Sequence, residues 1–333
     1  MTNEEILKKR WKEVDKKTIK LSKKRDNLNK ELQDDLQMYI DSLKITSTNF
    51  NKNASKTQKE RANRLIDKII SQDKLQGYLK YYATNIRNKT NVKNSELLRL
   101  VIYIAYTNES INLKGLEDVY FEEITNLAYT EAQQELRPNK KVSLIPYYVL
   151  ASLLMLENAK GYIWEEYKQA SLISNADQVY RQASIVITQD RELDINDNNF
   201  QDIFRAQRNR YLKINENSIS GDLDIEAVGL YNGALLSGYE KYGANDGKVR
   251  FIAEMDSHTT QMCQTLDNQV FNIKGFNTYY RYSASDNKSC KYVIEGLKLG
   301  ENLPPINNHF HWCRSTITYL HDNEQATNSI RNK

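Results

Sequence analysis

The residues best suited to metal or acid–base chemistry are concentrated in the last third of the chain. All four histidines and all three cysteines follow Gly243, and Asp256 lies among them. Cysteine thiolates and histidine nitrogens are the usual ligands of structural zinc, and a Cys2His2 set completes its tetrahedron. The spacing His309-x-His311-x-Cys313 would place all three side chains on one face of a strand. The ligands of such a zinc site would be Cys263, His309, His311 and Cys313, with His258 as an alternative.

The same residues allow a second interpretation without metal. The sequence contains no Cys-x-x-Cys pair to anchor a zinc ion, and buried thiols pack as small apolar groups. In this interpretation Arg314 donates a bidentate hydrogen bond to Asp256 or Asp267. We expect this metal-free arrangement and no cofactor, with zinc as the alternative. The residues of the expected structural clasp are Asp256, Cys263, Asp267, Cys313 and Arg314.

A catalytic role would need these side chains in a recognised arrangement. A metal-dependent nuclease or hydrolase could use Asp256, His258, His309 and His311, and Cys263 beside a histidine could act as a nucleophile. The sequence has no His-Glu-x-x-His and no Gly-x-Ser-x-Gly, and GANDGKV lacks the spacing of a phosphate-binding loop. We therefore expect no enzyme and no catalytic residues. A metal-dependent nuclease or hydrolase that uses the His/Cys/Asp cluster remains the alternative.

Secondary-structure patterns delimit a module around this cluster. A helix is expected over Asp222–Tyr242, and glycines then introduce β-rich runs. These runs are Val249–Met255, Gln269–Ile273 and Ser315–Leu320. The sequence therefore predicts a small α+β module over residues 221–322.

The order of short motifs in this module resembles that of a known family. A helix ending in GYEKYG precedes the strand RFIAEMD, then Leu-Asp, Pro-Pro and Cys-Arg-Ser follow. This order is similar to the C-terminal domain of phage-Mu F-like minor head proteins, over roughly a hundred residues. The matching residues are Asp256, Cys263, Leu266, Asp267, Pro304, Pro305, Cys313, Arg314 and Ser315. Asn268 replaces the usual glycine after Leu-Asp, and it can also adopt a left-handed turn. Thr260 and Ser315 replace two thiols of the four-cysteine members, which favours the metal-free interpretation.

The resemblance implies a structural role in a tailed phage or prophage. Members are low-copy components of the capsid interior or portal region, and they assist head assembly or DNA delivery. The partners implied are the portal protein and capsid or scaffold proteins. The locations implied are the virion and, during assembly, the host cytoplasm.

The N-terminal region has the pattern of a long amphipathic helix, predicted over residues 1–45. Leu7, Val14, Leu21 and Leu28 recur every seven residues. Trp11, Leu32 and Tyr39 widen the apolar stripe. A helix of about 40 residues cannot bury such a stripe alone. It needs a neighbouring subunit, a partner protein or its own chain, and a homo-oligomer is the simplest expectation.

This helix also carries the charge of the chain. Residues 1–31 contain eleven basic and six acidic residues, a net charge of +5 against +4 for the whole chain. Such a block can pair with phosphates of double-stranded DNA without reading sequence, or it can be an ordinary solvated face. The candidate DNA-binding residues are Lys8, Lys9, Arg10, Lys12, Lys16, Lys17, Lys20, Lys23, Lys24 and Arg25.

The remaining segments complete a mainly α-helical prediction. The polar run at 46–59 is typical of a linker, residues 60–220 have the pattern of an α-helical body, and residues 323–333 form a polar tail. The body is expected to break at Arg137-Pro138-Asn139.

Composition limits the cellular location. The longest apolar stretch, Val142–Leu156, is shorter than the roughly 18 residues of a membrane span and contains Pro146, so a buried helix is expected there. The N-terminus lacks the features of a signal peptide. Three cysteines are too few, and odd in number, for a disulfide framework, which fits a reducing compartment.

Overall fold

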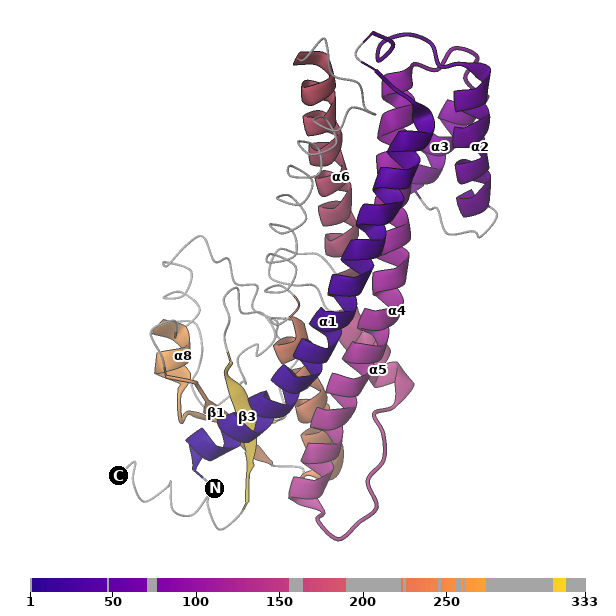
Figure 1. Ribbon diagram of the computed structural model, residues 1–333. Coiled ribbons are helices and arrows are strands. Elements are labelled where there is room, and N and C mark those ends of the chain that lie inside the picture. The colour runs from indigo at the N-terminus through magenta and orange to yellow at the C-terminus, as the bar shows by residue number, and fades with distance from the viewer. Residues whose placement is uncertain are drawn as a thin grey trace. The chain divides into compact units, whose positions relative to one another are not determined.

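The computed structural model confirms the predicted class, because the chain is mainly α-helical with a small sheet near its C-terminus (Figure 1). The structure describes residues 2–46, 48–70, 77–155, 164–189, 223, 226–244, 247–255, 259, 261–273 and 314–321. The helices are α1 (Asn3–Leu43), α2 (Lys56–Ile70), α3 (Gly77–Asn88), α4 (Asn94–Leu136), α5 (Tyr147–Leu154), α6 (Trp164–Gln189) and α8 (Gln261–Leu266), and residues 226–242 are also helical. The strands are β1 (Lys248–Ile252), β2 (Val270–Asn272) and β3 (Thr316–Leu320).

The chain forms two compact units that interleave along the sequence. The first unit comprises Met1–Leu21, Asp118–Trp164 and Ser220–Lys333, and the second comprises Ser22–Glu117 and Glu165–Ile219. Helices α1 and α4 each contribute residues to both units. This division differs from the predicted succession of helix, linker, body and module, because residues 1–45 do not form a part of their own.

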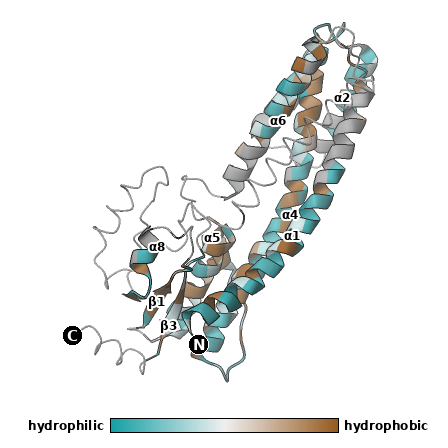
Figure 2. Ribbon diagram, turned by 60° about the vertical axis from the view of Figure 1, so that its left-hand side comes forward, coloured by the Kyte–Doolittle hydropathy of each residue, from teal (hydrophilic) through white to brown (hydrophobic). Residues whose placement is uncertain are grey.

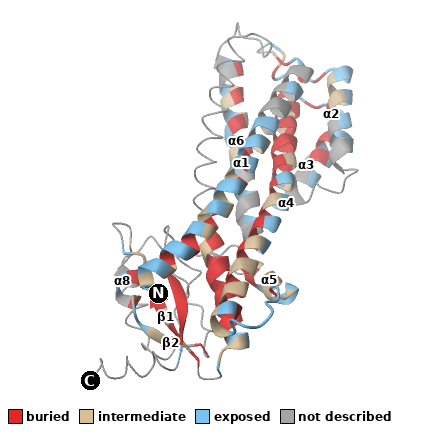
Figure 3. Cartoon of the chain, turned by 60° about the horizontal axis from the view of Figure 1, so that its bottom comes forward, coloured by how far each residue is buried: buried red, intermediate tan, exposed pale blue. Residues whose placement is uncertain are grey.

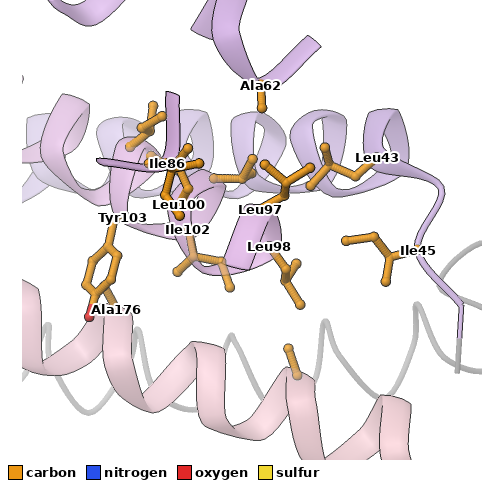
Figure 4. Close-up of a cluster of buried hydrophobic side chains, with 14 of the residues drawn as sticks. Leu43, Ile45, Ala62, Ile86, Leu97, Leu98, Leu100, Ile102, Tyr103 and Ala176 are labelled. Carbon is orange, nitrogen blue, oxygen red and sulfur yellow. The ribbon is translucent and has the colours of Figure 1, made fainter. Parts of the chain in front are cut away.

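The core of the second unit is built around the first half of α4. Residues 97–106 read LLRLVIYIAY, and all of them except Arg99 are buried. A helix that is apolar on all sides must be surrounded by other elements. Figure 4 shows Leu98 and Ile102 of α4 in the cluster that also includes Leu43 of α1 and Ala176 of α6.

The segment at 46–59 is packed in this unit and does not behave as the predicted linker. Phe50 and Ala54 are buried. The amide of Ala54 donates to the carbonyl of Val92 at 2.7 Å, and the amide of Ser95 donates to the carbonyl of Phe50 at 2.9 Å. Helix α2 begins at Lys56, inside the predicted linker. The polar composition was misleading because these main-chain hydrogen bonds fix the segment against the start of α4.

The first unit contains an antiparallel sheet with the strand order β2-β1-β3. In β1, Val249 and Phe251 are buried, and every residue of β3 is buried. β2 and β3 fall within the runs that the sequence predicted, and β1 overlaps its run but begins one residue earlier, at Lys248, and ends at Ile252 rather than at Met255.

Helix 226–242 packs closely against two neighbouring helices of the first unit. A Cβ atom built on Gly238 would lie 2.5 Å from the Cβ of Ala132 in α4. A Cβ on Gly233 would lie 2.6 Å from Cδ2 of Leu153 in α5. These two glycines therefore allow the helices to approach closely, and any larger residue at either position would push the helices apart.

The apolar stretch at 142–156 forms a shorter and more exposed helix than the sequence predicted. Helix α4 ends at Leu136, before the predicted break, and α5 starts after Pro146 at Tyr147. Leu153 is buried, but Tyr147 and Tyr148 are exposed. Figure 3 shows α5 largely in the exposed and intermediate colours. None of the described helices combines the length and apolar character that a membrane span requires.

Candidate nucleic-acid interface

The outward face of the first part of α1 carries a row of lysines. Lys8, Lys12, Lys16 and Lys20 are exposed and follow one another at intervals of four residues. Side chains at this spacing lie on one helix face, about 6 Å apart along the axis. Figure 2 shows the hydrophilic colouring of α1 near the N-terminus. We call these four residues the lysine row.

The opposite face of α1 holds the lysine row in place. Leu7, Trp11 and Val14 are buried in the first unit. The indole Nε1 of Trp11 donates to the carbonyl oxygen of Arg314 at 2.8 Å. The Trp11 ring also lies 5.5 Å from the ring of Tyr231, measured between centroids. The first part of the apolar stripe, from Leu7 to Leu21, is therefore covered by the chain itself, which was one of the three possibilities that the sequence left open.

Arg10 lies within this buried face and connects three elements. Its exposed fraction is only 2%. Its Nε donates to Oε1 of Glu131 in α4 at 3.1 Å. One terminal nitrogen, Nη1, donates to the hydroxyl of Thr316 at 3.0 Å and to the carbonyl of Ile317, both in β3. The other, Nη2, donates to the hydroxyl of Tyr239 at 3.2 Å. Arg10 is thus a structural side chain.

The groups around Arg10 form a charged, hydrogen-bonded network. The hydroxyls of Tyr231 and Tyr239 donate to Glu131 and Glu135, respectively. Burial is the largest influence on the pKa of Glu131 and raises it, but the charges of Arg10 and Lys9 and the hydrogen bonds from Tyr231 and Arg10 together hold that pKa below its usual range. Burial also raises the pKa of Tyr231 and Tyr239, so both phenols remain hydrogen-bond donors at neutral pH.

A shallow groove of about 510 Å³ runs beside the lysine row. Its lining residues are Leu7, Lys8, Trp11, Lys12, Asp15, Lys16, Ile19, Glu254 and Arg314. Two of its charges neutralise each other, because Arg314 donates from Nη1 and Nη2 to the two carboxylate oxygens of Asp15, at 2.9 and 2.8 Å. Lys8 also pairs with Glu4, and Glu254 is a further acid in the lining, so Lys12 and Lys16 are the exposed cations of the groove that could meet an anion.

The other candidate DNA-binding residues are placed differently. Arg10 and Arg25 are buried, so neither can serve as a surface phosphate contact, and the expectation for these two residues is corrected. The Nζ of Lys9 lies 3.8 Å from Oε1 of Glu131, and the Nζ of Lys17 lies 2.8 Å from Oε2 of Glu123, so both lysines are ion-paired. Lys23 and Lys24 are exposed on the part of α1 that belongs to the second unit. The stripe residue Leu28 is partly buried there.

Partners of two residues of the predicted clasp are described. Arg314 pairs with Asp15. Asp267 accepts a hydrogen bond from the amide of Ala253 at 2.9 Å. Asp267 was therefore the wrong partner for Arg314, because its carboxylate fixes the end of β1. Asp256 and Cys313 lie outside the described residues.

The turn after Asp267 agrees with the sequence. Asn268 has a φ of 63°, the left-handed conformation expected where the resembled family has glycine. Its Oδ1 also accepts a hydrogen bond of 2.7 Å from Nδ2 of Asn3 at the start of α1. The turn therefore contacts the helix that bears the lysine row.

The proposed metal ligands can be followed only in part. Cys263 lies in α8 and is buried. His258, His309, His311 and Cys313 lie outside the described residues. Among the residues that are described, no three His, Cys, Asp or Glu side chains gather as a metal site would require.

The sequence did not identify the acceptors of the Arg10 network. Two signals were present: Arg10 occupies the apolar stripe between Leu7 and Val14, and Glu131 and Glu135 are four residues apart on α4. An arginine in an apolar stripe requires a buried carboxylate partner. Spacing alone could not show which of the many carboxylates would be that partner.

Comparisons of the chain with protein-family models, with curated proteins and with solved structures found no match.

Proposed function

We propose that this chain is a minor head protein of a tailed phage or prophage that contacts double-stranded DNA without sequence preference. The proposal of a head protein rests on the ordered motif from Asp256 to Ser315 and on its place after a long helical region. The proposal of DNA contact rests on the lysine row. The two parts can be tested separately.

The observation that carries the DNA contact is the exposed position of the lysine row on an anchored helix. Lys12, Lys16 and Lys20 make no ion pair with any other described residue, so their charges are available to an external anion. The hydrogen bond from Trp11 and the network of Arg10 fix the opposite face of the helix. The row therefore keeps its spacing when it meets a ligand.

The chemistry of the row suits phosphate rather than bases. Lysine ammonium groups are compact, mobile point charges, whereas base edges are read by bidentate side chains such as arginine. Arg10 and Arg25, the two arginines of this region, are buried. Binding would release counterions from DNA and would weaken steeply as salt increases.

In the virion, the chain would join a protein partner to the packaged genome. The C-terminal module would contact portal, capsid or scaffold protein, as the resemblance implies, and the lysine row would face DNA. Such a contact could assist head assembly, DNA ejection or both. No residue in this account acts as a catalyst.

The head-protein proposal is tested with particles from cells that carry the gene. After induction, gradient-purified particles are analysed by mass spectrometry, before and after nuclease and protease treatment of intact particles. We expect the chain in low copy number and protected inside the particle. Particles that form normally and contain none of it would overturn the proposal.

A further inference from the structure

Five apolar side chains in and around α5 are unusually exposed. Tyr147 is 83% exposed, Tyr148 69% and Leu144 68%. The surface defined by the full set is called the α5 surface, and its residues are Val142, Leu144, Tyr147, Tyr148 and Met155. Contiguous apolar surface on a folded protein usually marks an interaction site.

The members of the α5 surface lie on α5 and on the loop before it. Tyr148 and Met155 are seven residues apart, about two helical turns, and Val142 and Leu144 belong to the loop that ends at Pro146. Leu153 points the other way and packs on Gly233. One side of α5 is therefore anchored, while the other side faces out with its aromatic and aliphatic groups.

The loop that leads into α5 is fixed by hydrogen bonds. The amide of Ser143 donates to Oε1 of Gln133 at 2.9 Å, and Nε2 of Gln133 donates to the carbonyl of Ser143 at 2.6 Å. The amide of Ile145 donates to Oδ1 of Asn126 at 2.9 Å. Leu144, between these two contacts, is thus held on the surface. Because this loop is already ordered, it would lose less conformational entropy on binding a partner.

Basic side chains surround the α5 surface. Between Arg137 and Met155 the sequence has three basic residues and no acidic one. The guanidinium of Arg137 lies 5.0 Å from the ring centre of Tyr242, and the ammonium of Lys241 lies 5.4 Å from the same ring. The hydroxyl of Tyr242 contacts that of Ser143 at 3.0 Å, which brings these cations to the loop. Lys140 and Lys141 are exposed in the same loop.

We propose that the α5 surface binds a segment of another protein in which apolar or aromatic side chains are flanked by aspartate or glutamate. Exposed tyrosines with arginine and lysine nearby are typical of the centres and edges of protein interfaces. The basic surroundings select an acidic partner by charge complementarity.

Two other occupants fit the surface less well. Val142, Leu144 and Met155 are aliphatic and offer no stacking face for the bases of a single-stranded nucleic acid. A second copy of this chain, related by a twofold axis, would bring two equally basic surfaces together, with like charges facing like. The α5 surface is also separate in the sequence from the lysine row, so the inference does not depend on the DNA contact.

The test uses the full chain and a random peptide library. Peptides that bind the immobilised parent protein are selected, and their affinities are measured by fluorescence polarisation. We expect the selected peptides to combine aromatic or aliphatic residues with aspartate or glutamate. Their affinity should fall at least about tenfold for Tyr147→Ser/Tyr148→Ser and for Lys140→Glu/Lys141→Glu. A control with two exposed apolar residues changed elsewhere, Val119→Ser/Ile185→Ser, should bind as the parent does.

Three results would overturn the inference. The first is a set of peptides without acidic enrichment, or one that binds the tyrosine variant as tightly as the parent. The second is single-stranded oligonucleotide binding that the tyrosine variant loses, which would assign the surface to nucleic acid. The third is self-association of the parent, measured by analytical ultracentrifugation, that the same variant abolishes. Circular dichroism of each variant confirms that it is folded.

Discussion

The guanidinium of Arg314 donates hydrogen bonds to both carboxylate oxygens of Asp15, although the two residues are 299 positions apart in the sequence. With the hydrogen bond from Trp11 to the carbonyl of Arg314, this pair joins the start of β3 to α1. The motif arginine therefore stabilises the helix that carries the lysine row.

The Arg314–Asp15 pair should contribute modestly to stability. Arg314 is 33% exposed and Asp15 43%, so water screens the pair. Its bidentate geometry favours a coupling energy of about 1 kcal/mol, well below that of a buried pair. Urea denaturation of Arg314→Ala, Asp15→Ala and the double variant measures this coupling. A coupling near zero would mean that the pair is a surface contact without energetic effect.

Arg10 should contribute far more than Arg314 to the free energy of unfolding. Replacing it with Met keeps much of the volume but leaves Glu131 and Glu135 without their shared counterion in a buried site. We expect a loss of about 3 to 5 kcal/mol in the free energy of unfolding. Glu131→Gln combined with Arg10→Met should recover part of it. An Arg10→Met protein as stable as the parent would contradict this account of the network.

The same network sets how stability changes in acid. Because the folded-state pKa of Glu131 is lowered, its stabilising contribution is present above its unfolded pKa of about 4.3 and is lost as the pH falls through the folded value. In Arg10→Met, burial acts without the opposing charge, so this contribution should disappear. Urea midpoints measured from pH 6 down to pH 3 should therefore fall less steeply for Arg10→Met than for the parent.

Glu109 should affect stability at the other end of the pH range. Burial raises the pKa of Glu109 to about 8 even though Arg25 opposes the shift. Its stabilising effect is complete below the unfolded pKa of about 4.3 and is lost as the pH rises toward 8, at no more than about 1.4 kcal/mol per pH unit. Glu109→Gln should remove this slope and be more stable than the parent at pH 9. Equal slopes for the two proteins would show that Glu109 is ionised in the folded state.

Replacement by alanine should change the stability of the protein in opposite directions at two glycines. Gly238→Ala would place a methyl group 2.5 Å from the Cβ of Ala132, so we expect a loss of about 1 to 3 kcal/mol. Gly115 in α4 has no atom within 4 Å of the added methyl, so Gly115→Ala should stabilise by about 0.5 to 1 kcal/mol. Thermal unfolding of the two variants in one buffer makes the comparison. A stabilising Gly238→Ala would mean that helix 226–242 and α4 are not in close contact.

Local patterns in the sequence predicted the elements well, but not how they come together. The seven-residue repeat of Leu7, Val14 and Leu21 predicted α1 and its buried face, and the left-handed Asn268 was predicted from the missing glycine. The partner of Arg314 could not be predicted, because periodicity gives no distance between residues 15 and 314. The prediction of a linker at 46–59 missed its packing for a related reason. Backbone hydrogen bonds to residues 92–95 hold this segment, and composition does not reveal them.

The candidate site was predicted only as a charge excess. Counting charges could not separate Lys12 and Lys16, which are exposed, from Arg10 and Arg25, which are buried. All four lie in the same basic block. The apolar stripe contained the missing information, because Arg10 lies three residues after Leu7 and four before Val14 and so shares their helix face.

The salt dependence of binding to double-stranded DNA tests the central claim most directly. Fluorescence anisotropy of the full chain with a labelled duplex should give a log–log slope of about −3.6 if the lysine row engages four phosphates, a loss of roughly a hundredfold between 50 and 200 mM salt. Lys12→Gln/Lys16→Gln/Lys20→Gln should reduce the slope to about −1. Lys52→Gln/Lys56→Gln/Lys93→Gln removes the same charge from other exposed positions and should keep the parental slope. If the first triple variant binds with the slope and affinity of the parent, the lysine row is a solvated surface and the proposed DNA contact is wrong.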